Sequence, residues 1–285
     1  MSDNFYTDND DLRFQIEKVI DWTALYEVVE RKANKEESPE TAADAIEIYE
    51  DILKEFGKFC AKKVAPVAPQ IDTDKPKLVD GKVVEGKAFA DVFKALKRMQ
   101  VYGLPVPREL GGLNAPALVY MGCAEMMARA DTSCMTHFGF FTGLAMSLVT
   151  YALRDPAAKI VDGRLVGTPY DKEITEMIEG KAWGCMVLTE PGAGSDLGAI
   201  RTTAVQQADG RFLLNGEKIF ITSGHAQYQL VLARTEDPDE VPGLKGLSLF
   251  LVEQRHVVDG KEVDNVRIGK LEHKIGHNGS PTCSL

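Results

Sequence analysis

Hydrophobic residues recur at helical spacing through the first part of the chain. Apolar positions follow a 3–4 residue period across residues 8–37, 45–60, 87–102 and 171–179, with charged residues between them. Residues 131–153 are apolar on nearly all sides, which predicts a helix that is buried against several neighbours. A proline after a cap residue, as in Ser38-Pro39, predicts the start of one helix. The pattern predicts helices over most of residues 1–182.

A different pattern begins at Trp183. Short runs rich in β-branched and aromatic residues recur about every ten residues, which is typical of antiparallel sandwiches and barrels. The pairs Asp209-Gly210 and Asn215-Gly216 lie between such runs and predict tight hairpin turns. We therefore predict an α+β multidomain chain. An N-terminal all-α helical domain occupies residues 1–182, and an antiparallel β-barrel or sandwich domain occupies residues 183–285.

Charge and composition narrow the classes of function. The net charge of −10 argues against affinity for nucleic acid or an anionic membrane, because both need a basic face. The first residues are acidic and polar and do not resemble a secretory or transit peptide. The longest apolar passage, residues 138–153, is interrupted by polar residues and is short for a membrane span. Scattered cysteines without a C-x-x-C spacing indicate reduced thiols. These features predict a cytoplasmic protein with no membrane span and no nucleic-acid partner.

Two strand-like runs carry the candidate chemistry, because each ends on a threonine, Thr189 or Thr222. The glycine-containing loop 191–196 follows the first run, and the N–H groups of such a loop can hold a pyrophosphate. Phe220 can stack on a flat ring. Each feature alone is more often structural: the loop a plain turn, the threonines ordinary strand residues and Phe220 a core residue. The loop matches neither a Walker loop nor a dinucleotide-binding fingerprint.

Other common site types are disfavoured. The five histidines show no metal-ligand spacing, so we predict no metal site. The sequence has no G-x-S-x-G elbow, which disfavours a serine hydrolase.

Three ordered motifs extend this interpretation. Residues 188–196, LTEPGAGSD, are similar to the flavin-binding signature of the acyl-CoA dehydrogenases. Residues 215–224, NGEKIFITSG, resemble the second signature of that family, and residues 274–283 resemble a strand near the end of its β domain. The acidic N-terminal extension resembles the branch with methylthiopropanoyl-CoA and longer-chain members.

The resemblance implies FAD as cofactor, lying against the β domain. The end of the first run would bind the pyrimidine edge of the flavin, Gly194 and Ser195 would face the pyrophosphate, and Phe220 would back the ring. Ser195 would also face the acyl-CoA. Many family members have tryptophan in place of Phe220 and tyrosine in place of Met186. The implied cofactor-binding residues are Met186, Val187, Leu188, Thr189, Gly194, Ser195, Phe220, Ile221 and Thr222.

The implied reaction is the α,β-dehydrogenation of an acyl-CoA thioester, with electron-transfer flavoprotein or a similar acceptor as partner. The family carries its catalytic glutamate in a further helical domain, and this sequence ends at Leu285. We therefore assign no catalytic residue and expect a fragment that is inactive and holds FAD weakly or not at all. The full-length protein would form a homodimer or homotetramer.

Two alternative functions and one question about a helix remain open. A non-catalytic or DNA-damage-related binding protein on the same scaffold would show no turnover of acyl-CoA substrates. An acyl-CoA oxidase would release peroxide. The apolar helix with His137, Phe138, Phe140, Phe141 and Leu144 either lines an acyl-chain pocket or simply packs in the core.

Overall fold

The computed structural model describes residues 2–30, 38–258 and 260–285. The chain divides into two compact units, one of Met1–Lys75 with Gly86–Ala182 and one of Pro76–Glu85 with Trp183–Leu285. The first unit is built mainly from helices and the second from strands, which confirms the predicted α+β class. The longer segment of the second unit begins at Trp183. The excursion 76–85 places a hairpin of the first half of the chain in the second unit.

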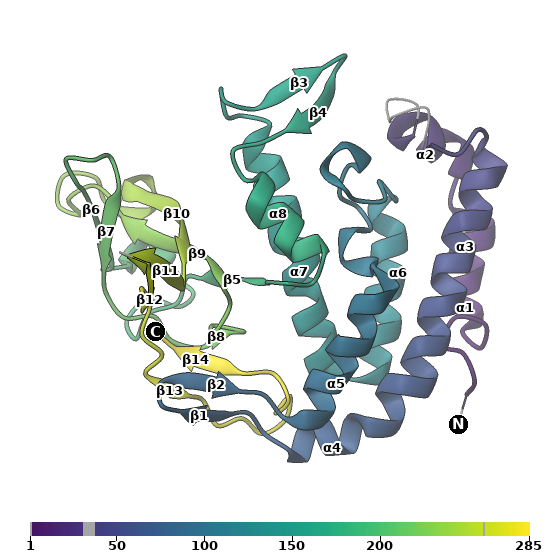
Figure 1. Cartoon of the computed structure of the whole chain (residues 1–285), viewed down its shortest axis with the longest axis horizontal. Coiled ribbons are helices and arrows are strands. Elements are labelled where there is room, and N and C mark those ends of the chain that lie inside the picture. Colours follow the sequence, from purple (N-terminus) through teal and green to yellow (C-terminus); the bar gives the residue numbers. More distant parts are fainter. Residues whose placement is uncertain (1, 31–37, 259) are drawn as a thin grey trace. The chain divides into compact units, whose positions relative to one another are not determined.

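Eight α-helices are described in the helical unit (Figure 1). Helices α3, α6 and α7 lie side by side in this unit. Short π-helical turns follow α1 and α3, at Gln15–Val19 and Cys60–Val64. The α-helices are α1 (Asp10–Phe14), α2 (Trp22–Val29), α3 (Ala42–Phe59), α4 (Ala68–Thr73), α5 (Lys87–Leu96), α6 (Ala117–Ala130), α7 (Thr132–Ala152) and α8 (Asp171–Ile178).

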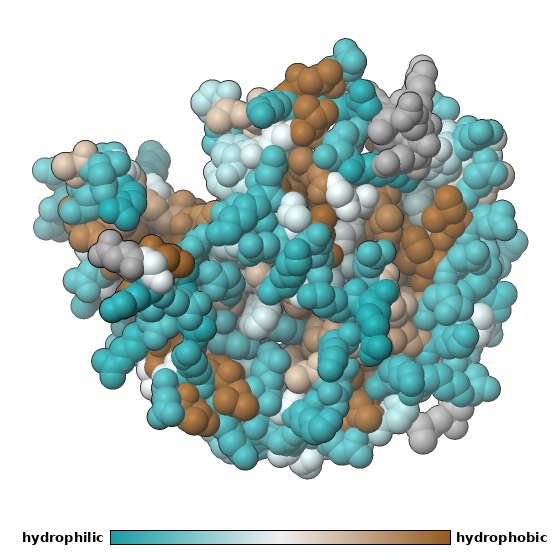
Figure 2. Space-filling view, viewed as in Figure 1, coloured by the Kyte–Doolittle hydropathy of each residue, from teal (hydrophilic) through white to brown (hydrophobic). Residues whose placement is uncertain are grey.

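Two local predictions for this unit were wrong. Helix α3 begins after Thr41 and not after Ser38, because Thr41 and Asp44 form a reciprocal capping box that satisfies the first N–H groups. The predicted loop 156–170 contains a hairpin, β3 (Lys159–Val161) and β4 (Arg164–Gly167). Figure 2 shows hydrophobic residues at this hairpin, where Ile160 and Val161 are exposed.

Helix α7 forms the centre of the helical core, as its apolar pattern predicts. Phe138 is fully buried, with its ring 5.4 Å from that of Phe56. Phe141 stacks on Tyr102 at 4.0 Å between ring centroids. His137 and Leu144 are buried as well, and Phe140 is half-buried. Core packing therefore accounts for most of the residues considered for an acyl-chain pocket.

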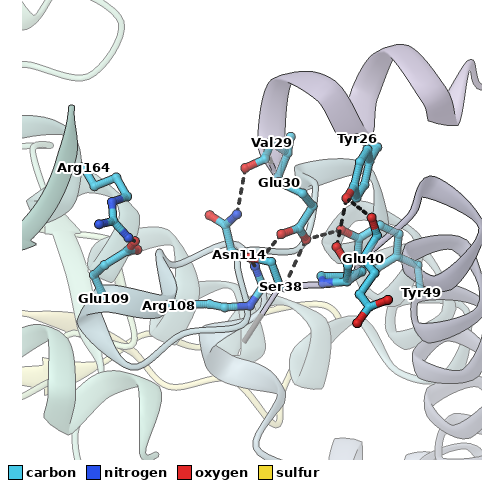
Figure 3. Close-up of polar contacts among 11 residues, drawn as sticks. Tyr26, Val29, Glu30, Ser38, Glu40, Tyr49, Arg108, Glu109, Asn114 and Arg164 are labelled. Atoms are coloured by element: carbon cyan, nitrogen blue, oxygen red, sulfur yellow. Dashed lines mark hydrogen bonds and ion pairs between the residues drawn. The ribbon is translucent and has the colours of Figure 1, made fainter. Parts of the chain in front are cut away.

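A buried ion pair joins distant parts of the helical unit (Figure 3). Glu30 lies at the end of α2, and its side chain, with the carboxylate, is 0% exposed. Both terminal nitrogens of Arg108 donate to it, Nη2 at 3.0 Å, and the Tyr49 hydroxyl donates at 2.6 Å. Burial, and then the hydrogen bond to Glu30, raise the pKa of Tyr49. Asn114 donates to the carbonyl of Val29 at 2.9 Å, next to the same site.

The β unit contains a principal sheet with the strand order β10-β9-β6-β7, in which β5 also pairs with β9. A smaller sheet has the order β13-β14-β8. The strands are β1 (Lys77–Val79), β2 (Lys82–Val84), β5 (Gly184–Val187), β6 (Thr203–Gln206), β7 (Phe212–Asn215), β8 (Ile221–Thr222), β9 (Tyr228–Arg234), β10 (Leu247–Glu253), β11 (Arg255–Val258), β12 (Lys261–Asp264), β13 (Lys270–Leu271) and β14 (Thr282–Ser284).

The predicted antiparallel barrel needs correction in two respects. Strand β5 pairs with β9 in parallel over its whole length, and β6 meets β9 in parallel at Thr203 and Arg234. Among the described residues, the strand pairings leave the sheets open and form no closed barrel. Parallel pairing needs long crossovers, which a pattern of short strands and tight turns does not reveal.

The turn predictions had mixed outcomes. Asp209-Gly210 lies in the β6–β7 hairpin, where Gly210 has a φ of 85°. Asn215-Gly216 forms no hairpin, because β7 pairs with β6, and the next strand, β8, pairs with β14. The β1–β2 hairpin joins the β unit through Glu85, whose carboxylate lies 3.0 Å from Nε2 of His225. No helix in the described part of the chain is apolar and long enough to span a bilayer.

We expect Arg108→Met to lower the free energy of unfolding of the helical unit by about 3–5 kcal/mol, because it leaves the buried Glu30 carboxylate unpaired. Denaturant unfolding followed by the fluorescence of Trp22, which lies 5.6 Å from Tyr49 between ring centroids, measures this in a Trp183→Phe background. The matched control is Arg129→Met, which removes a partly exposed pair with Asp8 and costs about 0–1 kcal/mol. Equal losses in the two variants would contradict the assigned role of Arg108.

Candidate functional site

Strand β5 presents one predicted site residue to solvent and buries its neighbours. Cys185 and Val187 are fully buried on one side of the strand, whereas Met186 is 39% exposed on the other. This is the alternation expected of a strand with one covered face. Val187 can therefore contribute to a ligand site only through its backbone groups.

The structure brings the two predicted motif segments together. The backbone N–H of Ile219 donates to the carbonyl of Thr189 at 2.9 Å, and β5 contacts β8. Lys218 exchanges backbone hydrogen bonds with Leu285, at 3.0 and 2.8 Å. The threonine that follows β5 and the threonine that ends β8 thus belong to adjoining parts of one surface.

The second segment carries an unusual backbone conformation at its exposed end. Phe220 has a φ of 60° and is 59% exposed. A bulky residue at positive φ is strained, and such strain is often found at functional sites. Ile221 is buried against the strands, and Thr222 pairs with Thr282 of β14. Phe220 is therefore held outward by a backbone that its own side chain does not favour.

The glycine loop after β5 is open at its tip and fixed at its base. Gly194 and Ser195 are exposed, and a Cβ atom placed on Gly192 or Gly194 would meet no described atom within 4 Å. Protein packing therefore does not explain the glycines, whereas close approach of a ligand would. At the base, Glu190 and Ala193 exchange backbone hydrogen bonds of 3.0 and 3.1 Å.

A buried ion pair, Lys218 with Glu190, lies beneath the loop. The side chains are 4% and 7% exposed, and Nζ lies 3.0 Å from Oε1. The Lys218 ammonium also donates to the carbonyls of Leu188 and Leu232, at 2.9 and 2.7 Å. Only a charged ammonium has the three N–H groups that these contacts require.

The electrostatics of this pair keep Glu190 ionised. Burial raises the pKa of Glu190, but hydrogen bonds from Thr202, Arg201 and Lys218 outweigh it, so the pKa lies below its usual value of 4.5. Burial lowers the pKa of Lys218, and its bond to Glu190 opposes that shift. A carboxylate that is ionised, buried and fully hydrogen-bonded is a poor proton acceptor. Glu190 is therefore suited to structure and not to general-base catalysis.

Sequence reasoning missed the importance of Lys218 and Thr202. Lys218 stands in the second motif beside the apolar run Ile219, Phe220 and Ile221. A charged residue next to a strand-like apolar run is the one signal that pointed to a buried pair. Thr202, whose hydroxyl donates to Glu190, carried no such signal. In the described part of the chain, no group of three or more His, Cys, Asp or Glu is placed to hold a metal ion.

Comparison with known families decides what this arrangement belongs to. The middle-domain model of the acyl-CoA dehydrogenases matches residues 185–285, and the N-terminal-domain model matches residues 47–160. The chain belongs to the acyl-CoA dehydrogenase family. The two motif segments, residues 188–196 and 215–224, thus lie in an acyl-CoA dehydrogenase middle domain, together with the Lys218–Glu190 pair.

Similarity to individual acyl-CoA dehydrogenases, in sequence and in structure, supports this assignment. The chain is 34% identical to 3-methylmercaptopropionyl-CoA dehydrogenase of Ruegeria pomeroyi, over 85% of this chain and 41% of that protein. It is 31% identical to the human mitochondrial short-chain specific acyl-CoA dehydrogenase, over 84% and 50%. The structure of butyryl-CoA dehydrogenase from Megasphaera elsdenii superposes with a TM-score of 0.63 at 26% identity, over 83% and 54%. The chain therefore spans about half the length of its relatives, or less.

We predict that Glu190→Gln destabilises the β unit at neutral pH and that this effect shrinks in acid. Because the folded pKa of Glu190 is lowered, its contribution to stability is full above pH 4.5 and is lost as the pH falls through the lowered pKa. Denaturant unfolding of both proteins, in steps from about pH 7 to about pH 3, measures the difference. A constant difference over this range would show that the charge of Glu190 is not what stabilises the fold.

Proposed function

We propose that this chain carries the flavin-binding part of an FAD-dependent enzyme that dehydrogenates the α–β bond of an acyl-CoA thioester. The main support is the hydrogen bond between Ile219 N–H and Thr189 C=O, at 2.9 Å, which joins the two signature segments on one surface. Family membership supports the same class of chemistry.

The residues present suit a flat, polar-edged cofactor with a diphosphate. Met186 and Phe220 offer exposed apolar surface to a ring system, and Thr189 and Thr222 are half-buried hydroxyl groups beside it. The open glycine loop suits a pyrophosphate, because successive backbone N–H groups can bind its oxygens. When bound, FAD would supply the redox chemistry of the dehydrogenation, as the acceptor of the electrons removed from the α–β bond.

Each predicted residue then has a task that its burial permits. Leu188 and the buried Val187 and Ile221 would act through backbone groups, and Thr189 and Thr222 would hydrogen-bond ring atoms. Gly194 and Ser195 would bind the pyrophosphate, and Ser195 would also face the acyl-CoA. Orientation of the cofactor and a polar surrounding are what the protein contributes to such a reaction.

We propose that the catalytic base lies outside these 285 residues. Glu190 is the buried carboxylate at the glycine loop, and its lone pairs are already used by Lys218 and the loop base. For the electron acceptor we propose electron-transfer flavoprotein. We propose a homodimer or homotetramer for the full-length protein.

Phe220→Ala should lower the affinity of the chain for FAD by about fivefold, since an aromatic contact contributes about 1 kcal/mol. Titration with FAD, followed by the quenching of flavin fluorescence, measures the effect. The matched control is Phe212→Ala, which removes a partly exposed aromatic residue of the same unit on β7. Equal losses for the two variants would remove Phe220 from the site.

The reaction itself is tested on the full-length protein that contains these 285 residues. A panel of acyl-CoA thioesters with an artificial electron acceptor should give acceptor reduction that depends on substrate and FAD. Turnover with none of the thioesters would contradict the proposed dehydrogenation and favour a binding protein. Stoichiometric peroxide from molecular oxygen would identify an oxidase instead.

A further inference from the structure

We propose that the buried Lys218–Glu190 pair is a positioning device. It sets the conformation of the glycine loop, taken here with the four residues that follow it as residues 191–200, before any ligand arrives. The proposal rests on the proposed function, because it takes this loop as the pyrophosphate-binding element. Neither Lys218 nor Glu190 would touch the cofactor. Both would act through the loop that they hold.

The carboxylate of Glu190 closes the loop at its base. It accepts hydrogen bonds from the backbone N–H of Arg201 at 2.7 Å and of Thr202 at 3.0 Å. The hydroxyl of Thr202 donates to the same carboxylate. One side chain at the start of the loop therefore binds the two residues that follow its end. The separation of the loop ends, and hence its curvature, is fixed by these bonds.

The ammonium of Lys218 attaches this closed loop to the sheet. Its contacts are the carbonyl of Leu188, just after β5, the carbonyl of Leu232, within β9, and the carboxylate of Glu190. Lys218 itself belongs to the second motif, one residue before Ile219, which is bonded to Thr189. The cation therefore sets the glycine loop in register with the segment that carries Phe220.

A separate contact joins the same elements. A Cβ atom added to Gly216 would lie 2.2 Å from Oγ1 of Thr202 and 2.8 Å from its Cα. These distances are too short for any side chain, so Gly216 is required for the close approach of the second motif to the loop base. Gly216 and Lys218 thus hold Thr202 and Glu190 from the same stretch of chain.

Stability alone does not explain a charged pair at this place. Burying two charges costs desolvation free energy, and well-packed apolar residues of similar volume often stabilise a fold as well or better. Directional contacts to three carbonyl or carboxylate oxygens, in contrast, fix geometry that apolar packing does not. A loop that is already ordered loses less conformational entropy on binding, which raises affinity. The pair therefore fits a role in pre-organisation.

The first test measures the loop without any cofactor. Hydrogen–deuterium exchange of the FAD-free chain should show about tenfold faster exchange in residues 191–200 for Lys218→Met and for Glu190→Gln, because ordering of the loop is lost. Exchange in β10 should rise less than exchange in the loop, because that strand feels only the general loss of stability of the β unit. The control is Arg211→Met, which removes an exposed pair with Asp209 in the same unit and should leave the loop unchanged. Thr202→Val, which removes one hydrogen bond and no charge, should give a smaller increase and serves if a charged-pair variant is too unstable to purify.

The second test separates positioning from plain structural support. Lys218→Met and Glu190→Gln should each lower FAD affinity by about tenfold, which corresponds to about 1.4 kcal/mol. The double variant should lose less than the two single losses combined, because each single change strands the partner of a coupled pair. Unchanged loop exchange in Lys218→Met, or an equal rise throughout the β unit, would overturn the proposal.

The two proposals fail in different ways. A wild-type chain that binds no FAD, with loop exchange that still rises in the variants, would overturn FAD binding by this chain and support the positioning of the loop. A wild-type chain that binds FAD, with variants that bind it equally well and keep a protected loop, would overturn the positioning role and leave the proposed function standing.

Discussion

The contact between the Lys218 ammonium and the Glu190 carboxylate is the interaction on which the candidate site depends. It joins the residue after β5, the end of the glycine loop and the second motif at one buried point. Without the cation, the carboxylate would be buried without a counter-charge, and the loop would lose the group that closes it. The segments that carry the exposed residues Met186 and Phe220 meet through the hydrogen bond from Ile219 N–H to the Thr189 carbonyl.

The helical unit uses the same kind of interaction for a different purpose. Glu30 and Arg108 are also buried and charged, and Tyr49 completes the hydrogen bonding of the carboxylate. That pair holds the end of α2 against a short 3-10 helix, Arg108–Leu110, which begins 78 residues after Glu30. In both units an acidic protein with a net charge of −10 keeps a few basic groups inside, at points where chain segments far apart in sequence meet.

The sequence predicted those features of the fold that depend on residues close together in the chain better than those that depend on distant residues. The helical period predicted α7 and its burial, because that signal repeats along one element. It misplaced the start of α3, since a capping box at Thr41 competes with the proline signal at Ser38-Pro39. The antiparallel barrel was wrong in detail, because parallel pairing of β5 with β9 joins strands about 40 residues apart. The motifs gave the family, whereas the individual cofactor residues remain predictions.

The sequence by itself determined the family, the order of a helical and a β-rich part, and the identity of two adjoining signatures, because these are recorded in local patterns and motifs. Only the tertiary structure decided that Lys218 and Glu190 are partners, that Thr202 and Gly216 touch, and that residues 76–85 join the β unit. The physical reason is that burial removes water as the partner of a charge. Which protein group replaces that water is set by the folded geometry and not by spacing along the chain.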